Sequence, residues 1–187
     1  FALSDSVIYK GDDNKYYEQV GKSDKEITEE IAFDLPNGWS WCRLKDICSI
    51  FTGATFKKEE TVTTKEGVRI LRGGNISPFE LRIKDDDIFL TKDKVKEDII
   101  LKENDILTPA VTSLENIGKM VRVNSDMPNT TVGGFVFIIR LYLKNQWISK
   151  YILYLLSSPF MIDFMKSITN KSGQAFYNIG KERLSTA

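Results

Sequence analysis

The strongest pattern of apolar side chains runs through residues 131–143. Successive side chains of a β-strand point to opposite faces, so this segment presents two sets of residues. The first set is Phe135, Phe137, Ile139 and Leu141, and the second is Val136, Ile138, Arg140 and Tyr142. Because both sets are rich in apolar side chains, the pattern predicts a central strand that is covered on both faces.

Shorter segments with the β-branched and apolar character of strands occur at residues 68–72, 87–90, 105–108 and 119–123. The first of them is followed by Gly73 and Gly74. This order predicts a strand that enters a loop where the backbone needs the conformational freedom of glycine.

A short amphipathic helix is predicted before these strands. Leu44, Ile47, Cys48 and Phe51 stand at positions i, i+3, i+4 and i+7, the spacing of one helical face. Ser40 is the expected N-cap of this helix, and Gly53 follows its expected end.

Two helices are predicted after the central strand. The first has apolar residues at helical spacing: Trp147, Ile148, Tyr151, Ile152, Leu155 and Leu156. Ser158 as N-cap and Pro159 at the first helical position predict the second, which runs through Lys166. Strands first and helices last favour an α+β fold with a mixed or antiparallel twisted sheet over alternating βαβ units.

Residues 1–34 contain turn-forming stretches and few regularly spaced apolar positions, so they are predicted to be a linker without a stable element of its own. Short extended pieces could hold this linker on the surface of the domain through Tyr9, Tyr16, Tyr17, Val20 and Ile27. The domain itself is expected to span residues 35–187. Trp39 and Trp41, at its start, are expected to belong to its core.

Composition agrees with one globular domain, because 42% of the 187 residues are hydrophobic and 28% are charged. The formal net charge is zero, but it is unevenly distributed along the chain. Residues 1–34 carry four Lys/Arg and nine Asp/Glu, so that 22 basic and 17 acidic side chains remain in residues 35–187, a net charge of +5. This mildly basic body is compatible with nucleic acid but is also common in other proteins.

The cellular compartment is suggested by three features of the sequence. Cys42 and Cys48 do not have the spacing of a redox or zinc motif, and they are expected to be free thiols in a reducing compartment. No apolar run has the roughly 20 residues that a membrane-spanning helix needs. The first residues lack the pattern of a signal peptide, so we expect a cytoplasmic protein.

Catalytic chemistry finds little support. The chain has no histidine, which removes the commonest general base and metal ligand. It also has no phosphate-binding loop, no dinucleotide-binding glycine motif and none of the signature of base methyltransferases, so no cofactor is expected. Asp85, Asp86 and Asp87 are read as a solvated turn rather than a metal site. A nuclease site built from the acidic residues near 97–105 is not recognisable, but the sequence does not exclude it.

A series of short motifs, in order along the chain, resembles the target recognition domain of Type I restriction-modification specificity subunits. The motifs are the opening with Trp39 and Trp41, Gly53 with Thr55, Arg72-Gly73-Gly74-Asn75-Ile76, Asn104-Asp105-Ile106-Leu107, Ile117-Gly118-Lys119, and Ser172-Gly173-Gln174 running to Asn178-Ile179. The resemblance covers most of residues 35–184. Residues 6–18 also resemble the connector that precedes the second of the two recognition domains in many members.

The resemblance implies a non-catalytic protein that binds double-stranded DNA and reads one half of a split target site. Methyltransferase subunits, and through them restriction subunits, are the implied partners. This copy is expected to be the C-terminal recognition domain. The long spacer helix that follows such domains in the family lies outside residues 35–187.

The expected DNA contacts lie in four loops and use no metal. They are Thr55, Lys57 and Lys58; Arg72, Gly73 and Asn75; Thr112, Ser113 and Lys119; and Lys171, Ser172, Gln174, Tyr177 and Asn178. Arg72 has the donor fork that matches guanine, and Asn75 the amide that matches adenine. Lysines suit phosphates, and Gly73 allows close approach of the backbone.

Each of these assignments has a structural alternative. Arg72 could bind a carboxylate, Glu59 and Glu60 could neutralise the neighbouring lysines, and the hydroxyl groups could belong to ordinary turns. A different class of function is also open, that of a protein-binding module that uses the apolar surface of Trp147, Tyr151, Tyr154 and Phe160.

Overall fold

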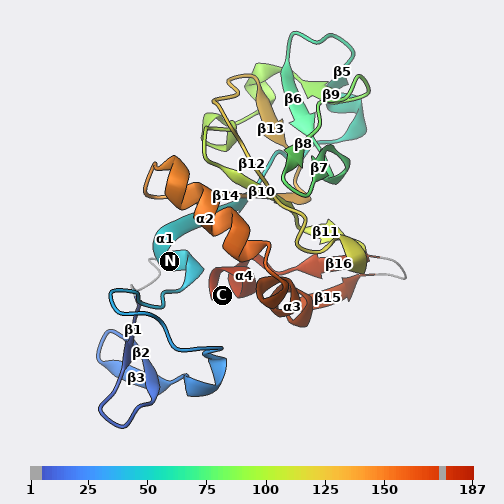
Figure 1. Ribbon diagram of the computed structural model, residues 1–187. Helices are drawn as coiled ribbons and strands as arrows, with labels where there is room; N and C mark the ends of the chain where they lie inside the picture. The colour runs from blue at the N-terminus through green and yellow to red at the C-terminus, as the bar shows by residue number, and fades with distance from the viewer. Residues whose placement is uncertain (1–5, 173–175) are drawn as a thin grey trace.

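The computed structural model describes residues 6–172 and 176–187, with the side chains of residues 171, 172 and 176 also left out of the description. Its described elements form three parts that follow one another in space (Figure 1). The N-terminal strands form a small sheet at one end. The helices and the C-terminal hairpin form the middle part. The sheets built from the strands of residues 61–90 and 130–132 form a second group at the other end. Strands with mostly antiparallel pairing and separate helices confirm the predicted α+β class.

The central sheet has the strand order β12-β10-β14-β4. Its strands are β4 (Cys48–Thr52), β10 (Ile106–Pro109), β12 (Val121–Arg122) and β14 (Val136–Leu141). Phe137, Ile139 and Leu141 of β14 belong to the core under the C-terminal helices, whereas Val136 and Ile138 belong to a second core on the opposite face. The predicted central strand with two covered faces is therefore confirmed for this part of the segment.

The segment 131–143 is nevertheless not one strand. Its first residues form β13 (Thr130–Val132), which belongs to another sheet of order β13-β6-β9-β5. The partners there are β5 (Thr61–Val62), β6 (Val68–Leu71) and β9 (Ile88–Leu90), with β6 parallel to β13. Gly133 and Gly134 interrupt the run because the Val136 amide donates to the Gly133 carbonyl and closes a turn. The small hairpin of β7 (Ile76–Ser77) and β8 (Glu80–Leu81) lies beside this sheet.

The predicted helix through Phe51 is wrong beyond its first turn. Helix α1 covers only Leu44–Ile47, with Arg43 rather than Ser40 as its N-cap residue, and β4 begins at the next residue. Five residues of β4 pair with β14 in antiparallel register. Pairing with a central strand satisfies the backbone and buries the same apolar side chains, so it prevails over the local helical spacing.

The two helices predicted after the central strand are confirmed. Helix α2 covers Gln146–Leu156, and α3 covers Pro159–Ser167 with the Ser158 hydroxyl accepting from the Met161 amide. A hairpin and a last helix follow them in the chain, and the hairpin pairs with a short strand that precedes α2 to form a sheet of order β11-β16-β15; none of these elements was predicted. These elements are β11 (Val111–Thr112), β15 (Thr169–Ser172), β16 (Phe176–Ile179) and α4 (Lys181–Ser185). No helix among the described residues is long and apolar enough to cross a membrane.

The N-terminal residues are more ordered than the sequence suggested. Strands β1 (Ser6–Lys10), β2 (Tyr16–Val20) and β3 (Ser23–Glu26) form an antiparallel sheet. Most of its side chains are exposed or half-buried, so the strands leave no clear apolar period in the sequence. Cross-strand contacts such as the Tyr9–Tyr17 ring stack, 5.7 Å between centroids, hold the sheet instead. The domain boundary between residues 34 and 35 remains a prediction.

The two tryptophans of the domain opening have different surroundings. Trp41 is half-buried and packs at 5.1 Å against the ring of Phe33. Trp39 is 56% exposed and lies against Tyr151 of α2, so its expected place in the core is wrong. Cys42 and Cys48 are both free, as expected, and Cys48 is buried.

Candidate nucleic-acid interface

A short turn at residues 133–135, between β13 and β14, brings the first two predicted loops together. On one side, the Ala54 amide donates to the Val132 carbonyl at 2.8 Å, so the loop with Thr55 begins next to this turn. On the other side, the Gly133 amide donates to the Leu71 carbonyl at 2.8 Å. Because Arg72 follows Leu71 directly, the Arg72 loop also begins at this turn.

The same turn is linked to the predicted loops of the C-terminal half. The Ala110 amide donates to the Phe135 carbonyl at 2.8 Å, and the Ala110 carbonyl accepts from the Ile179 amide at 2.9 Å. Strand β11 then pairs with β16, so that Thr112 lies opposite Tyr177. Figure 1 shows β11 and β16 side by side, next to the place where β10 leads into β11. The first three predicted loops therefore begin near this turn, and the fourth ends near it at Asn178.

The loop after β6 is built around the buried side chain of Asn75, which is 1% exposed. Its Oδ1 accepts from the Arg72 amide at 2.8 Å, and its Nδ2 donates to the Arg82 carbonyl at 2.8 Å and to Asp87 Oδ1 at 2.6 Å. Both ends of the amide are thus used inside the protein. The expectation that Asn75 reads adenine does not fit this position, and we give Asn75 a structural role instead. An asparagine side chain commonly accepts from a backbone amide a few residues away, here that of Arg72 three residues earlier, and that signal could have identified it.

Asp87 is the hydrogen-bonding centre of this loop. Its carboxylate accepts from Asn75, from the Lys84 amide at 2.9 Å and from Arg69 Nη1 at 2.9 Å. Burial by itself raises the pKa of Asp87, but the hydrogen bonds from Lys84, Asn75 and Arg69 outweigh it and hold this pKa below its usual value. The expected solvated turn is therefore found only for Asp85 and Asp86.

Arg72 is half-exposed at the outer end of this loop. Its Nη2 lies 3.3 Å from the Asp86 carbonyl and 3.5 Å from Asp86 Oδ2, and the Asp86 side chain is 77% exposed. Such an exposed pair contributes little to stability and can be exchanged for another anion or acceptor. The guanidinium group is thus held near the surface but is not committed to a buried partner.

Thr55, Lys57 and Lys58 are all exposed. The carboxylate of Glu60 accepts from the Lys57 amide at 2.7 Å and binds Lys94 at 3.3 Å, and the hydrogen bond from Lys57 is the main reason that the pKa of Glu60 is lowered. Within the described residues, no ion pair involves the ammonium group of Lys57 or Lys58. The carboxylate of Glu60 therefore pairs with Lys94 and does not neutralise Lys57 or Lys58.

The three residues of the third predicted group, Thr112, Ser113 and Lys119, lie in different surroundings. Thr112 is half-buried in β11. The Ser113 hydroxyl donates to Glu115 at 2.7 Å and accepts from Asn116 at 2.6 Å, which is the local turn that the structural alternative described. Lys119 is half-buried and lies beyond this turn.

In the fourth group, Tyr177 is half-buried against the core under the C-terminal helices, and Asn178 is exposed. Lys171 and Ser172 are in β15, but their side chains lie outside the described residues, as does Gln174 altogether. The register places Lys171 opposite Tyr177 in the β15–β16 hairpin.

One further exposed residue, Phe135, lies at this turn and was not among the predicted contacts. Phe135 is 74% exposed, although the alternation of residues 131–143 assigned it to a buried face. The adjacent Gly133 and Gly134 are the signal that could have revealed it, because two successive glycines typically mark a turn.

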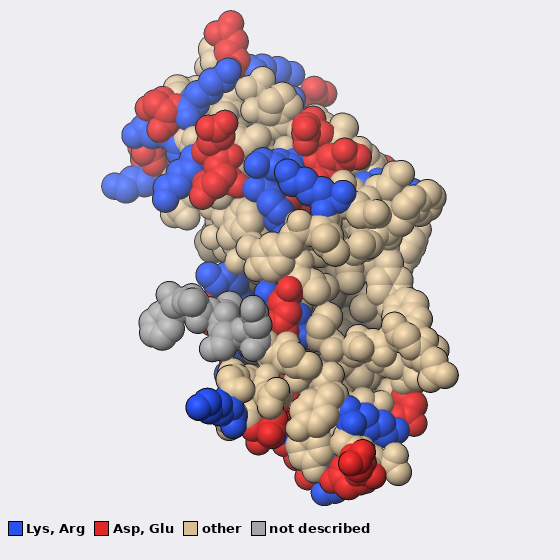
Figure 2. All heavy atoms as spheres, turned by 90° about the vertical axis from the view of Figure 1, so that its left-hand side faces the viewer, with Lys and Arg blue, Asp and Glu red and all other residues tan. Residues whose placement is uncertain are grey.

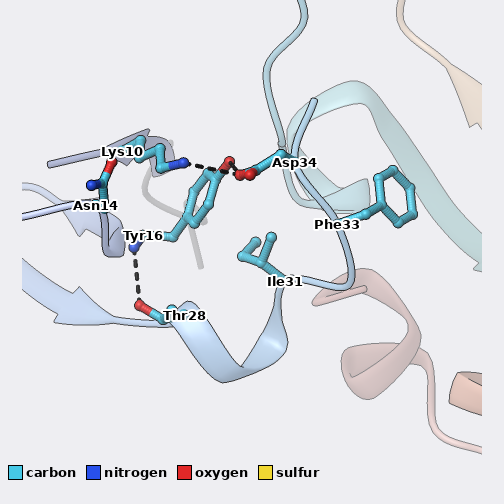
Figure 3. A pocket seen from close by; sticks show the side chains of 7 residues that line it. All are labelled: Lys10, Asn14, Tyr16, Thr28, Ile31, Phe33 and Asp34. Atoms are coloured by element: carbon cyan, nitrogen blue, oxygen red, sulfur yellow. Dashed lines mark hydrogen bonds and ion pairs between the residues drawn. The ribbon is translucent and has the colours of Figure 1, made fainter. Parts of the chain in front are cut away.

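The described part of the chain contains no cluster of three or more metal-ligating side chains. A hollow of about 580 Å³ lies in the N-terminal part, and Figure 3 shows Lys10 and Tyr16 pointing toward Asp34 at its edge. Asp34 binds both Lys10 Nζ and the Tyr16 hydroxyl at 3.0 Å. Lys10, Tyr16 and Asp34 are thus hydrogen-bonded to one another in this hollow.

The charged side chains are unevenly distributed over the surface. Figure 2 shows Lys/Arg and Asp/Glu mixed at the end of the molecule that holds the second group of sheets, and a broad uncharged band across the middle of this face. Several exposed aromatic side chains extend along α2 or pack on it: Trp39, Phe79, Trp147, Tyr151 and Tyr154. We call these five residues the α2 aromatic row.

Comparisons with known proteins give a consistent result. No family model matches the chain. The chain is 36% identical over 104 residues to the Type I restriction enzyme EcoAI specificity subunit of Escherichia coli, an alignment that covers 54% of this chain and 17% of that subunit.

Among solved structures, a chain from a study of complex assembly and conformational transition of the type I restriction-modification system superposes with a TM-score of 0.56 and 19% identity. This superposition covers 83% of the present chain and 34% of the other. The S subunit from M. genitalium gives a TM-score of 0.49 at 19% identity, covering 83% and 35% of the two chains. The chain is thus homologous to part of a Type I restriction enzyme specificity subunit and shares its fold with a chain of a solved type I restriction-modification system.

Proposed function

We propose that this chain is a target recognition domain that binds double-stranded DNA and reads one half of a bipartite target site. The observation that carries the proposal is that three of the predicted loops begin, and the fourth ends, near the turn at residues 133–135, together with the homology to a specificity subunit. The domain carries out no chemistry of its own. It directs methyltransferase subunits, and through them restriction subunits, to the site it reads. This role agrees with the expected cytoplasmic location.

In this proposal some residues contact the bases of the DNA and others contact its phosphates and sugars. Arg72 reads a guanine through its donor fork, and Asn178 reads a base edge from the β15–β16 hairpin. Phosphates and sugars are contacted by the remaining expected residues: Thr55, Lys57, Lys58, Thr112, Ser113, Lys119 and Tyr177. Gly73 keeps the backbone open for close approach, and Asn75 positions the Arg72 loop. Lys171, Ser172 and Gln174 stay as proposed readers of the same hairpin.

The test is a change of the recognised sequence. The protein that carries this chain is co-expressed with its methyltransferase subunits, and methylated sites are mapped across the host genome. We expect Arg72→Gln and Asn178→Ser to alter or relax one half-site and to leave the other half unchanged. Lys22→Ala, at an exposed position in the N-terminal sheet, is the control. Persistent methylation at an unchanged half-site in both variants would show that these residues are not readers.

A second candidate function rests on the α2 aromatic row. Trp147 is 68% exposed and Tyr154 is 64% exposed, and aromatic side chains in such number are typical of protein interfaces. In this reading the domain binds a protein of the modification complex and has little DNA contact of its own. The two functions are separated by Trp147→Ala with Tyr154→Ala. A loss of complex assembly, combined with a half-site that does not respond to Arg72 or Asn178, favours the protein-binding module.

A further inference from the structure

Phe135 is an exposed aromatic residue whose ring has no partner among the described residues; Tyr142 shares this property, but its hydroxyl group donates to the Lys45 carbonyl at 3.4 Å. At 74%, Phe135 has the largest exposed fraction among the exposed large hydrophobic residues. Trp39 and Phe79 pack on rings of α2, Phe160 packs against Phe33, and Trp147 lies under the ammonium group of Lys150. Within the described residues, Phe135 takes part in no aromatic pair and no cation–π contact. Its ring is therefore available to a ligand.

Hydrogen bonds hold the backbone that carries this ring in a fixed place. The turn is closed by the hydrogen bond of 3.0 Å from the Val136 amide to the Gly133 carbonyl. The Phe135 carbonyl accepts from Ala110, and β14 begins at the next residue. A side chain with only two rotatable bonds on such a backbone loses little conformational entropy when it binds.

The groups next to this turn indicate which kind of ligand Phe135 would contact. A Cβ atom placed on Gly134 would lie 2.9 Å from Thr55 Oγ1, so the Thr55 hydroxyl lies against the turn. Beyond Thr55 come the exposed Lys57 and Lys58, and on the other side of the turn Arg72 follows Leu71. An exposed apolar ring on a turn that is flanked by a hydroxyl group and by loops with exposed cations suits a ligand that is anionic at its edges and has an apolar group in its interior.

Duplex DNA meets both requirements. Its phosphates supply the anionic edges, and the C5-methyl group of thymine is an apolar group that the major groove exposes. We propose that Phe135 packs on a thymine methyl group in the major groove and makes one position of the recognised half-site require an A·T pair. The proposal rests on the proposed DNA-reading function and adds a reader that acts by apolar contact rather than by hydrogen bonding.

The experiment couples a change in the protein to a change in the DNA. The protein with its methyltransferase subunits is titrated with a fluorescent duplex that carries the mapped site, and each thymine of the half-site is replaced in turn by deoxyuridine, which lacks the methyl group. We expect one replacement to weaken wild-type binding several-fold. Phe135→Ala should lose about tenfold on the normal duplex, equivalent to about 1.4 kcal/mol, and should not respond to that replacement.

Two variants control this measurement. Leu143→Ala removes another exposed apolar side chain, 66% exposed, beyond the opposite end of β14, and should bind like wild type. Phe135→Leu keeps an apolar side chain and should retain part of the response to the methyl group. Because Phe135 is exposed, its variants should unfold at the wild-type temperature.

The outcomes separate this inference from the function beneath it. Wild-type protein that binds the mapped site no better than unrelated DNA contradicts the DNA-reading function itself. Selective wild-type binding with an unaffected Phe135→Ala variant, or a loss that is independent of every thymine methyl group, overturns the role of Phe135 alone. A mapped half-site without any A·T pair overturns it as well.

Discussion

At the scale of single residues, Asp87 determines the shape of the proposed reading loop. Its side chain is fully buried and accepts from Arg69, Asn75 and the Lys84 amide. These donors come from both sides of the Arg72 loop, so one carboxylate fixes the loop to β6. Removing the charge would leave Arg69 without its partner and the loop without its centre.

We expect Asp87→Asn to lower the free energy of unfolding by about 2 kcal/mol at pH 7, because a hydrogen-bonded charged group is lost from a buried site. In the folded protein the pKa of Asp87 is lowered. The ionised carboxylate therefore stabilises the fold above its unfolded-state pKa of about 3.9, and this contribution disappears as the pH falls through the lower folded-state value. Urea unfolding at pH 7 and at about pH 3 checks both expectations.

Asp86→Asn is the matched control, since the Asp86 side chain is exposed and should matter little at either pH. The Asp87 variant should also lose less stability on acidification than wild type. Parallel losses in the two proteins would show that Asp87 is not a source of the acid sensitivity.

At the scale of elements, the structure depends on a close crossing between the segment after β4 and strand β13. A Cβ atom on Gly53 would lie 1.8 Å from the Val132 carbonyl oxygen, which is backbone and cannot move aside. Glycine is thus needed there for close approach rather than to end a helix.

Gly53→Ala should separate the two segments and lower the free energy of unfolding by about 2 to 3 kcal/mol, the usual cost of overpacking. Gly74→Ala is the control, because its added Cβ would meet only the end of the flexible Lys84 side chain at 3.3 Å. Thermal unfolding followed by circular dichroism distinguishes the variants. Equal melting temperatures for both would mean that the crossing yields without cost.

The sequence predicts those elements whose signals are local. The apolar alternation of β14 and the Ser158-Pro159 start of α3 are confirmed because each depends on neighbours in the sequence. The helix expected through Phe51 fails because the pairing of β4 with β14 joins residues far apart in the chain. No local pattern in residues 44–51 contains that information.

The same distinction applies to the candidate site. The adjacency of Thr112 and Tyr177 comes from the pairing of β11 with β16 and is invisible in the sequence. Asn75 fits a base reader by residue type, yet its amide is used entirely within its own loop. Residue type predicts possible chemistry, whereas burial decides whether the group is available for it.

At the scale of the whole molecule, the uneven charge becomes a measurable property. Residues 35–187 carry a net charge of +5, and Lys57 and Lys58 extend from the proposed interface. If both bind phosphates, Lys57→Ala with Lys58→Ala should reduce the slope of log affinity against log salt by about 2, since each contact contributes about 0.9. The preferred half-site should not change, because phosphate contacts carry no direct sequence information.

Binding measured at four salt concentrations gives this slope. Lys22→Ala, which removes one exposed lysine far from the proposed interface, should leave the slope at its wild-type value. An unchanged slope in the double variant would remove Lys57 and Lys58 from the set of phosphate contacts.

Arg43 joins the N-terminal sheet to the rest of the molecule. Its Nη2 lies 2.6 Å from Glu18 and 2.8 Å from Glu30, and its Nη1 donates to the Thr186 carbonyl at 3.0 Å. The hydrogen bond from Arg43 is the main reason that the pKa of Glu18 is lowered. One guanidinium group thus connects β2, α1 and the residues after α4.

Arg43→Ala should leave the Glu18 carboxylate largely buried without a partner and lower the free energy of unfolding by about 3 kcal/mol. Arg43→Lys keeps the charge but not the fork, and should recover only part of this loss. Limited proteolysis provides a local readout, because cleavage within residues 6–34 should become faster. Unchanged cleavage rates would mean that the N-terminal sheet is held by other contacts.

The hydrogen bond of 2.8 Å from the Leu44 amide to the Ala187 carbonyl has a consequence for evolution. It places the beginning and the end of segment 44–187 at neighbouring points, so this stretch of chain returns to where it started. A segment with adjacent ends can be transplanted between host proteins without spreading the flanking chain. Under the proposed DNA-reading function, exchange of such a segment would change the recognised half-site and leave the flanking chain in place.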